Sequence, residues 1–258
     1  MKAQGFYSNI PLMSFIKGCF PNKFKIFIGV FIFIIWMYAC KKDAPIAPLD
    51  LGYNYFPTQI GSFVIYDVDS IVHNDFTGKI DTFKYQIKEI IDTVYLDNSN
   101  RPTLRIERYK KNYNKSIPYS SIPWTLKNVC SGNRTKSSAE KVEENQRFVK
   151  LVFPIRLNAV WNGNIFNSMR EWTYTYKEVN QPGRYGSLAF DSTLQVIQIN
   201  SENKIYKKYF QEIYAKNVGI VYKEIIDVVS DTIIQFIPVM KRISSGLEFK
   251  MTISSYGN

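Results

Sequence analysis

The stretch Phe63-Val-Ile-Tyr-Asp-Val-Asp-Ser-Ile-Val72 decides the fold class, because β-branched and aromatic residues alternate in it with aspartates. Alternation of period two is typical of a β-strand, whose successive side chains point to opposite faces. Turn-forming residues at 74–78 end this strand, and a second alternating run follows at 81–95. After the polar residues 97–100, the run 103–109 is expected to pair with the second strand as a hairpin.

The same pattern continues toward the C-terminus. Further strands are predicted at 147–153, 170–179, 192–199 and 216–229, and a final hairpin at 233–243 and 247–254 with its turn near Ser244-Ser-Gly246. The stretch 203–215 fits both periods, since Ile205, Tyr209 and Ile213 would share a face in a helix and in a strand. We prefer a long strand in a meander for this stretch.

The middle of the chain interrupts the pattern. Pro118 and Pro123 break it, and the polar segment 131–145 is expected to be a loop with one helical turn near 139–144. About ten strands without alternating helices indicate a mostly β, antiparallel fold. We expect a strongly curved antiparallel sheet or half-barrel, with a β-sandwich as the alternative, and an N-terminal signal helix.

The leader has the layout of a secretory signal. A lysine-containing segment precedes the uncharged run 26–40, which ends with Ala39 and Cys40. A cysteine in this place is typical of bacterial lipoproteins, which are cut before it and acylated on it. A helix over the run would rise roughly 22 Å against a hydrocarbon core of about 30 Å, so an uncleaved short membrane anchor is the alternative.

The sequence therefore predicts a lipoprotein signal peptide at 1–39, a lipidated tether at 40–52 and a single β-rich domain at 53–258. Residues 41–50, KKDAPIAPLD, contain two prolines and would span at most roughly 33 Å. Acyl chains on Cys40 contribute about 0.8 kcal/mol per buried methylene, which holds the protein at the membrane. The predicted location is the outer membrane, facing the periplasm or the cell surface.

The charge balance excludes a nucleic-acid partner. The chain has 33 basic and 22 acidic residues, a net charge of +11, but four lysines lie in the leader and leave +7 from Cys40 onward. The excess is dispersed, with no run of five or more like charges, whereas nucleic-acid sites are clustered patches. We interpret it as a solvated basic surface near anionic head groups.

Catalytic and metal-binding patterns are missing from the sequence. His73 is the single histidine, and Cys130 is the single cysteine after Cys40, with no neighbouring base. Asp67 and Asp69 lack the further ligands of a calcium loop and are expected on a solvent-facing strand side. We therefore expect no metal, no cofactor and no enzyme activity.

Aromatic residues are abundant, with 18 Tyr, 18 Phe and 4 Trp. Packing in a β core is the first interpretation. The alternative is a concave face that holds an apolar ligand, a glycan or a partner, for which the candidate residues are Trp161, Trp172, Tyr174 and Tyr176.

Two segments resemble uncharacterised cell-envelope lipoproteins of Bacteroidetes-type bacteria. The first is Tyr55-Phe-Pro-Thr-Gln-Ile-Gly-Ser-Phe-Val-Ile-Tyr66, similar to their Y-x-P-x-x-x-G-x-x-W-x-Y opening, with Phe63 at the Trp position. The second is Tyr214-Ala-Lys-Asn-Val-Gly-Ile-Val221, similar to their Y-A-x-G-V-G-L-V segment. The resemblance implies a lipid anchor and a β-rich fold, and it implies no activity.

The sequence thus favours a non-catalytic, lipid-anchored binding module for an apolar ligand or partner protein. A structural or accessory subunit of an outer-membrane complex is the second hypothesis, and an envelope hydrolase with dispersed carboxylates is the third. A sheet without a pocket would favour the structural subunit. Two carboxylates that face one another in a cleft would favour the hydrolase.

Overall fold

The computed structural model describes residues 49–258, and Asp50–Asn258 form one compact unit. The predicted signal helix, Cys40 and residues 40–48 of the predicted tether lie outside the described residues. No helix in the described part of the chain is long and apolar enough to cross a membrane.

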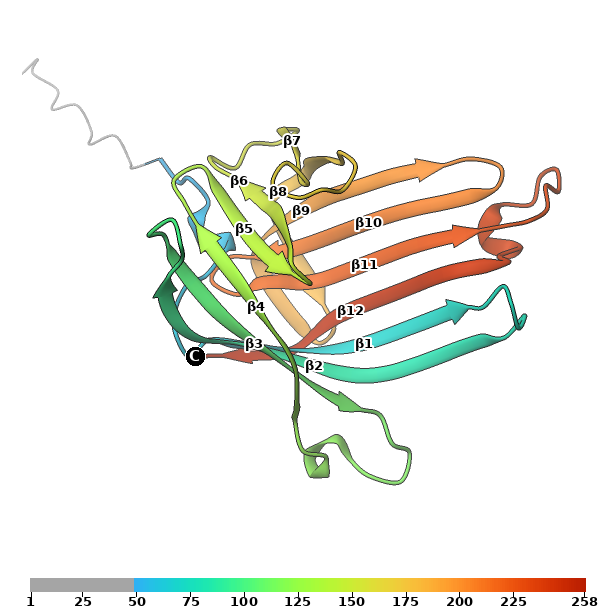
Figure 1. Cartoon of the computed structure of the whole chain (residues 1–258), viewed down its shortest axis with the longest axis horizontal. Helices are drawn as coiled ribbons and strands as arrows, with labels where there is room; N and C mark the ends of the chain where they lie inside the picture. The colour runs from blue at the N-terminus through green and yellow to red at the C-terminus, as the bar shows by residue number, and fades with distance from the viewer. Residues whose placement is uncertain (1–48) are drawn as a thin grey trace, which may run out of the picture. The chain divides into compact units, whose positions relative to one another are not determined.

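Twelve strands form one antiparallel sheet (Figure 1). The strands are β1 (Phe63–His73), β2 (Ile80–Leu96), β3 (Pro102–Asn112), β4 (Thr125–Arg134), β5 (Ser138–Glu143), β6 (Gln146–Val152), β7 (Val160–Asn162), β8 (Thr173–Tyr185), β9 (Leu188–Glu202), β10 (Tyr206–Ala215), β11 (Gly219–Val229) and β12 (Ser245–Gly257). Their order in the sheet is β6-β5-β4-β3-β2-β1-β12-β11-β10-β9-β8-β7. Each strand pairs with its neighbours in sequence, except that β6 and β7 lie at the two edges of the order, and the first and last strands pair at the centre.

The sheet curls until its two edge strands meet. The amide of Val149 in β6 donates to the carbonyl of Gly163, just after β7, at 2.9 Å. The indole of Trp161 in β7 donates to the carbonyl of Val149 at 2.8 Å. These contacts join the two edge strands locally, whereas β8 after Tyr176 and β4 before Ser131 are paired on one side only. The curved antiparallel sheet predicted from the sequence is confirmed, and one continuous sheet replaces the alternative sandwich.

The N-terminal segment covers one end of the curled sheet. A short 3₁₀ helix, η1 (Tyr53–Tyr55), places the fully buried Tyr55 with its hydroxyl 2.9 Å from Asn180 and from Ser192. Residues 50–52, assigned by the sequence to the tether, also pack on the unit. Asp50 pairs with Lys216 at 2.8 Å, and the carbonyl of Leu51 accepts a hydrogen bond from Ile155.

Most strand predictions are confirmed. The ambiguous stretch 203–215 contains strand β10, and β2 and β3 form the expected hairpin. Gly61 and Gly219 both have φ near 90°, a backbone conformation that glycine adopts at little cost in free energy.

The predicted loop at 131–145 is wrong, because β4 and β5 occupy most of it. Its polar residues suggested solvent exposure, but Asn133, Glu140 and Lys141 are buried and paired with polar partners. A strand can therefore bury a polar sequence when its charges are compensated.

The predicted hairpin strand at 233–243 is also wrong. This segment is a loop that contains the 3₁₀ helix η3 (Val239–Lys241) after Pro238. Proline cannot donate to a sheet ladder, so a strand through Pro238 is disfavoured. The strand β12 instead begins at Ser245 and pairs with β1 and β11.

Candidate functional site

The inside of the curled sheet contains a group of charged side chains, which we call the interior charge network. Its members are Glu89 on β2, Arg108 on β3, Lys141 and Glu143 on β5, Lys150 on β6, Glu212 on β10 and Lys223 on β11. Strands β2, β3, β5 and β6 belong to one half of the sheet order, and β10 and β11 belong to the other. The network therefore connects strands that are distant along the sheet.

Glu212 is the centre of one half of the network. Its side chain has no exposed surface, and Lys150 donates to Oε1 at 2.7 Å. Lys223 lies 3.2 Å from the same oxygen, and the hydroxyl of Tyr214 donates to Oε2 at 2.6 Å. Both carboxylate oxygens therefore have partners, as a buried charge requires.

Glu89 is the centre of the other half. The ammonium of Lys141 donates to both of its oxygens at 3.0 Å, and Arg108 donates to Oε1. Arg108 also contacts Glu143 at 2.6 Å. Glu143 joins the two halves, because its other oxygen lies 3.8 Å from the ammonium of Lys150.

The network holds its carboxylates ionised. Burial alone would raise the pKa of Glu89, but the charges of Lys141 and Arg108 outweigh it and lower the pKa to about 2. Burial is likewise outweighed at Glu212, where Lys150 and Lys223 lower the pKa to about 2. The pKa of Glu143 is well below its usual value for the same reason. A general acid at neutral pH needs a raised pKa, so these carboxylates are poorly suited to acid catalysis.

The network carries more positive than negative charge. Four cationic side chains face three carboxylates, which leaves a formal excess of one positive charge among these described residues. An excess charge inside a protein favours an anionic partner.

An apolar cavity of about 90 Å³ ends on this network. Its walls are mainly apolar and include Phe56, Ile91, Leu104 and Ile106, and it reaches Glu89, Lys141, Lys150 and Tyr214. Because about 10–15 Å³ suffices for one water, the space is large enough for a short apolar chain. The arrangement therefore offers an apolar wall and ammonium groups to one ligand.

The four aromatic residues predicted as ligand-binding candidates belong to the packed core or its border. Tyr174 and Tyr176 are buried, and Trp161 packs on both with ring centroids 5.7 and 4.6 Å away. Trp172 packs instead edge-on against Phe210 at 5.1 Å. The structure thus brings three of the four together, without an open aromatic face.

Two of these tyrosines have evident structural roles. The hydroxyl of Tyr176 donates to the carbonyl of Val152 and accepts from its amide, both at 2.8 Å, which fastens β6 to β8. The ring of Tyr174 lies so close to Gly163 that a β-carbon there would be 2.3 Å from it. Position 163 therefore needs glycine for close packing.

The other residues considered from the sequence lie elsewhere. His73 contacts Glu248 at 2.9 Å near the end of β1, and Asp67 and Asp69 are exposed on β1, as predicted. Cys130 is buried, and its burial raises the pKa of the thiol, which favours the inert form that the sequence suggested.

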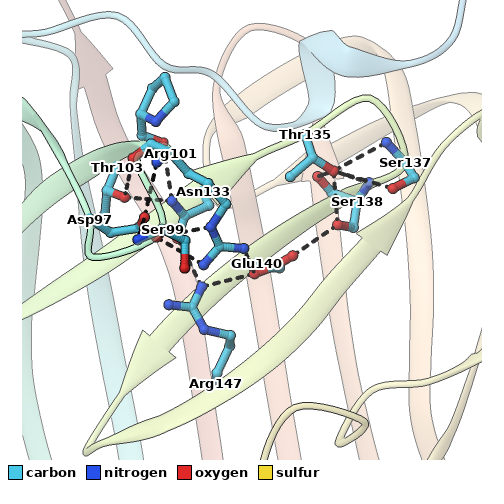
Figure 2. Close-up of polar contacts among 11 residues, drawn as sticks. Asp97, Ser99, Arg101, Thr103, Asn133, Thr135, Ser137, Ser138, Glu140 and Arg147 are labelled. Atoms are coloured by element: carbon cyan, nitrogen blue, oxygen red, sulfur yellow. Dashed lines mark hydrogen bonds and ion pairs between the residues drawn. The ribbon is translucent and has the colours of Figure 1, made fainter.

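A second polar cluster lies on the opposite face of β5 (Figure 2). Arg147 donates to Glu140 at 2.8 Å and to Asn133 at 2.9 Å. Arg101 pairs with Asp97 at 2.9 Å and lies 3.4 Å from Glu140. We interpret this cluster as structural, because it fastens the β2–β3 turn to β4, β5 and β6.

Sequence reasoning missed every member of the interior charge network. Lys150 and Glu212 are 62 positions apart, and no spacing rule connects them. The one available signal is charged residues at alternate positions where a strand should be apolar, as at Lys141 and Glu143 after the buried Ala139.

No protein-family model matches the sequence, and no curated protein matches it. Two solved structures are similar to the chain. One is a candidate lipoprotein from Parabacteroides distasonis, 12% identical with a TM-score of 0.36 over 79% of this chain and 98% of that chain. The other is a candidate exported protein with a YmcC-like fold from Bacteroides fragilis, 11% identical with a TM-score of 0.37 and the same coverage. TM-scores this low establish neither a common fold nor a common function.

The first prediction concerns the Lys150–Glu212 pair. Replacement of Lys150 by Met leaves a buried carboxylate short of a partner and is expected to lower the free energy of unfolding by about 3–5 kcal/mol in urea titrations. The double variant Lys150→Met/Glu212→Gln should lose less than the sum of the two single losses. The control is Lys84→Met in the exposed pair with Asp69, which should cost at most about 1 kcal/mol. Equal losses at both pairs would contradict a special role of the buried one.

The second prediction concerns acid. Glu89 and Glu212 have a folded-state pKa near 2 against an ordinary value of 4.5, so the unfolded chain binds protons first as pH falls. The free energy of unfolding should therefore fall between about pH 4.5 and pH 2, by roughly 3 kcal/mol per carboxylate. Denaturation at a series of pH values measures this slope. Glu212→Gln should make it shallower, and an unchanged slope would contradict the assignment.

Proposed function

We propose that this chain is a lipid-anchored cell-envelope protein of the outer membrane that binds an amphipathic ligand with one acidic group. The anchor is Cys40, as the leader and the resemblance to envelope lipoproteins indicate. The ligand's apolar part lies against Leu104 and Ile106, and its acidic group lies near Lys141 and Lys150.

One observation carries the ligand proposal: an apolar cavity ends on a buried network whose cations outnumber its carboxylates. A ligand pocket is typically apolar with a few convergent polar groups that fix orientation. The ammonium groups of Lys141 and Lys150 would supply that orientation, since a ligand anion balances the excess charge. A fatty acid is the simplest molecule with this chemistry.

The observations favour this function over its two rivals. A purely structural subunit has no need of a cavity, and filling it with apolar side chains would stabilise the fold. A hydrolase that works with a pair of carboxylates needs one carboxyl group that keeps a proton at neutral pH. The three interior carboxylates have lowered pKa values, and cations separate them.

The third prediction concerns the anchor. Mass spectrometry of the protein purified from bacterial envelopes should show a mature N-terminus at Cys40 that carries acyl chains. Cys40→Ala should keep the leader and lose the acyl mass, since the thiol is the attachment point. An unmodified Cys40, or an intact leader on the wild-type protein, would refute the anchor and would leave the cavity assignment unaffected.

The fourth prediction concerns the cavity. A fatty acid with a photoreactive diazirine in its chain, added to the membrane-bound protein, should label peptides that line the cavity. Leu104→Trp fills the cavity and is expected to reduce this labelling at least tenfold, equivalent to about 1.4 kcal/mol of binding free energy.

Leu157→Trp is the matched control, because Leu157 is exposed and does not line the cavity. The corresponding fatty alcohol should label less than the acid, since it lacks the charge that Lys141 and Lys150 would bind. Equal labelling of wild type and Leu104→Trp would refute the cavity as the binding site. Equal labelling by acid and alcohol would refute the role of the two lysines.

A further inference from the structure

One end of the sheet presents apolar loops to solvent. The loops are the β1–β2 turn (74–79), the β9–β10 turn (203–205) and the β11–β12 loop (230–244), all at the right of Figure 1. Strands β1 and β12 are paired with His73 opposite Gly246, so the first and third loops are neighbours. We call these three segments the loop end.

Two phenylalanines at the loop end are almost completely exposed. Phe76 is 95% exposed in the β1–β2 turn, and Phe236 is 96% exposed in the β11–β12 loop. Five isoleucines in these loops or directly next to them are each at least two-fifths exposed: Ile80, Ile205, Ile233, Ile234 and Ile237. Single exposed apolar residues are ordinary, but a group confined to neighbouring loops marks an interaction surface.

The loop that carries Phe236 is held in place by the protein. The guanidinium of Arg242 donates to the carbonyl of Ile237 at 3.0 Å and to the hydroxyl of Ser230 at 2.7 Å. It also donates to the carbonyl of Lys204, which ties this loop to the β9–β10 turn. Val239 is buried beneath the loop. The fold therefore maintains the exposure of Phe236.

The backbone at Phe236 forms part of a hydrogen-bonded turn. Its φ is 65°, in the left-handed region that costs a non-glycine residue about 1–2 kcal/mol. The amide of Ile237 donates to the carbonyl of Ile234 at 3.3 Å and closes the turn, while the ring of Phe236 stays exposed.

The charge at the loop end selects the kind of partner. The three loops contain the basic residues Lys79, Lys204, Lys241 and Arg242 against the acidic residues Asp75 and Asp231, an excess of two positive charges. Lysine is depleted at protein–protein interfaces, whereas phenylalanine with lysine is typical of membrane-surface binding. Each basic residue near an anionic bilayer contributes about 1 kcal/mol.

We propose that the loop end binds the surface of an anionic bilayer, with Phe76 and Phe236 inserted at the boundary between head groups and acyl chains. Burial of a phenylalanine gives about 1.5–3 kcal/mol, so the two rings and the basic residues together suffice for reversible binding. The chain enters the unit at the opposite end, where Asp50 pairs with Lys216. The loop end therefore lies at the other end of the unit from its first residue, Asp50.

Site-specific cross-linking tests this proposal. The full chain is reconstituted in vesicles of phosphatidylcholine with roughly one-third phosphatidylglycerol, with p-benzoylphenylalanine in place of Phe236 or, separately, Phe76. Because the replaced rings are exposed, folding should be unaffected. After illumination, mass spectrometry should find covalent lipid adducts at both positions, at least fivefold more than in vesicles of phosphatidylcholine alone.

The matched control carries the same group at Leu96, which is exposed at the other end of β2. Because the chain enters the unit at this end, its adduct yield should not change when phosphatidylglycerol is added. An equal rise at 96 and 236 would overturn the proposal, since membrane proximity alone would then explain both yields. Cross-links from position 236 to a second protein chain, in vesicles or in cells, would also overturn it and would assign the loop end to a protein partner.

Discussion

The ion pair between Lys150 and Glu212 is the constraint on which the rest of the structure depends. It joins β6 and β10, strands that lie far apart in the sheet order, across the interior of the curl. Both charges are almost fully buried, so each is tolerable only while the other is present. Glu143 extends the pair to Lys141, Arg108 and Glu89, which connects the charge network to the β2–β3 wall. The charge network thus connects walls that the curl brings together, and it lies at one end of the cavity.

The class of the fold follows from local patterns, whereas the candidate site does not. Alternation in the stretch 63–72 and in the run 81–95 suffices to predict strands, because period two is a local property of the backbone. The same rule failed at Lys141, where a buried charge looks like a solvent-facing residue. Its partner Glu89 is 52 positions away, so no reading of one segment could show that the charge is compensated. Pairing across a curled sheet is visible in three dimensions only.

The aromatic residues also show what the sequence cannot predict, namely which face of the sheet is buried. Tyr174 and Tyr176 were candidates for a ligand surface, and both are buried on the same face of β8. Which side of the sheet that face lies on is decided by the curl, which places them inside against Trp161. The polar atoms of these large side chains then stabilise the closure of the sheet, as the contacts of Tyr176 with Val152 show. The same residues could serve a core or a groove, and tertiary context alone distinguishes the two.

The pairing of β1 with β12 has a consequence for how the chain acquires its structure. These strands are the first and the last to be synthesised, and they form the central ladder of the sheet. Six strands lie on each side, so a chain without β12 would consist of two half-sheets, each with an unpaired inner edge. Contacts between such distant segments form slowly, and open edges favour aggregation. The chain therefore stays open to misfolding until its last strand is available to close the central ladder, whatever the order in which its hairpins form.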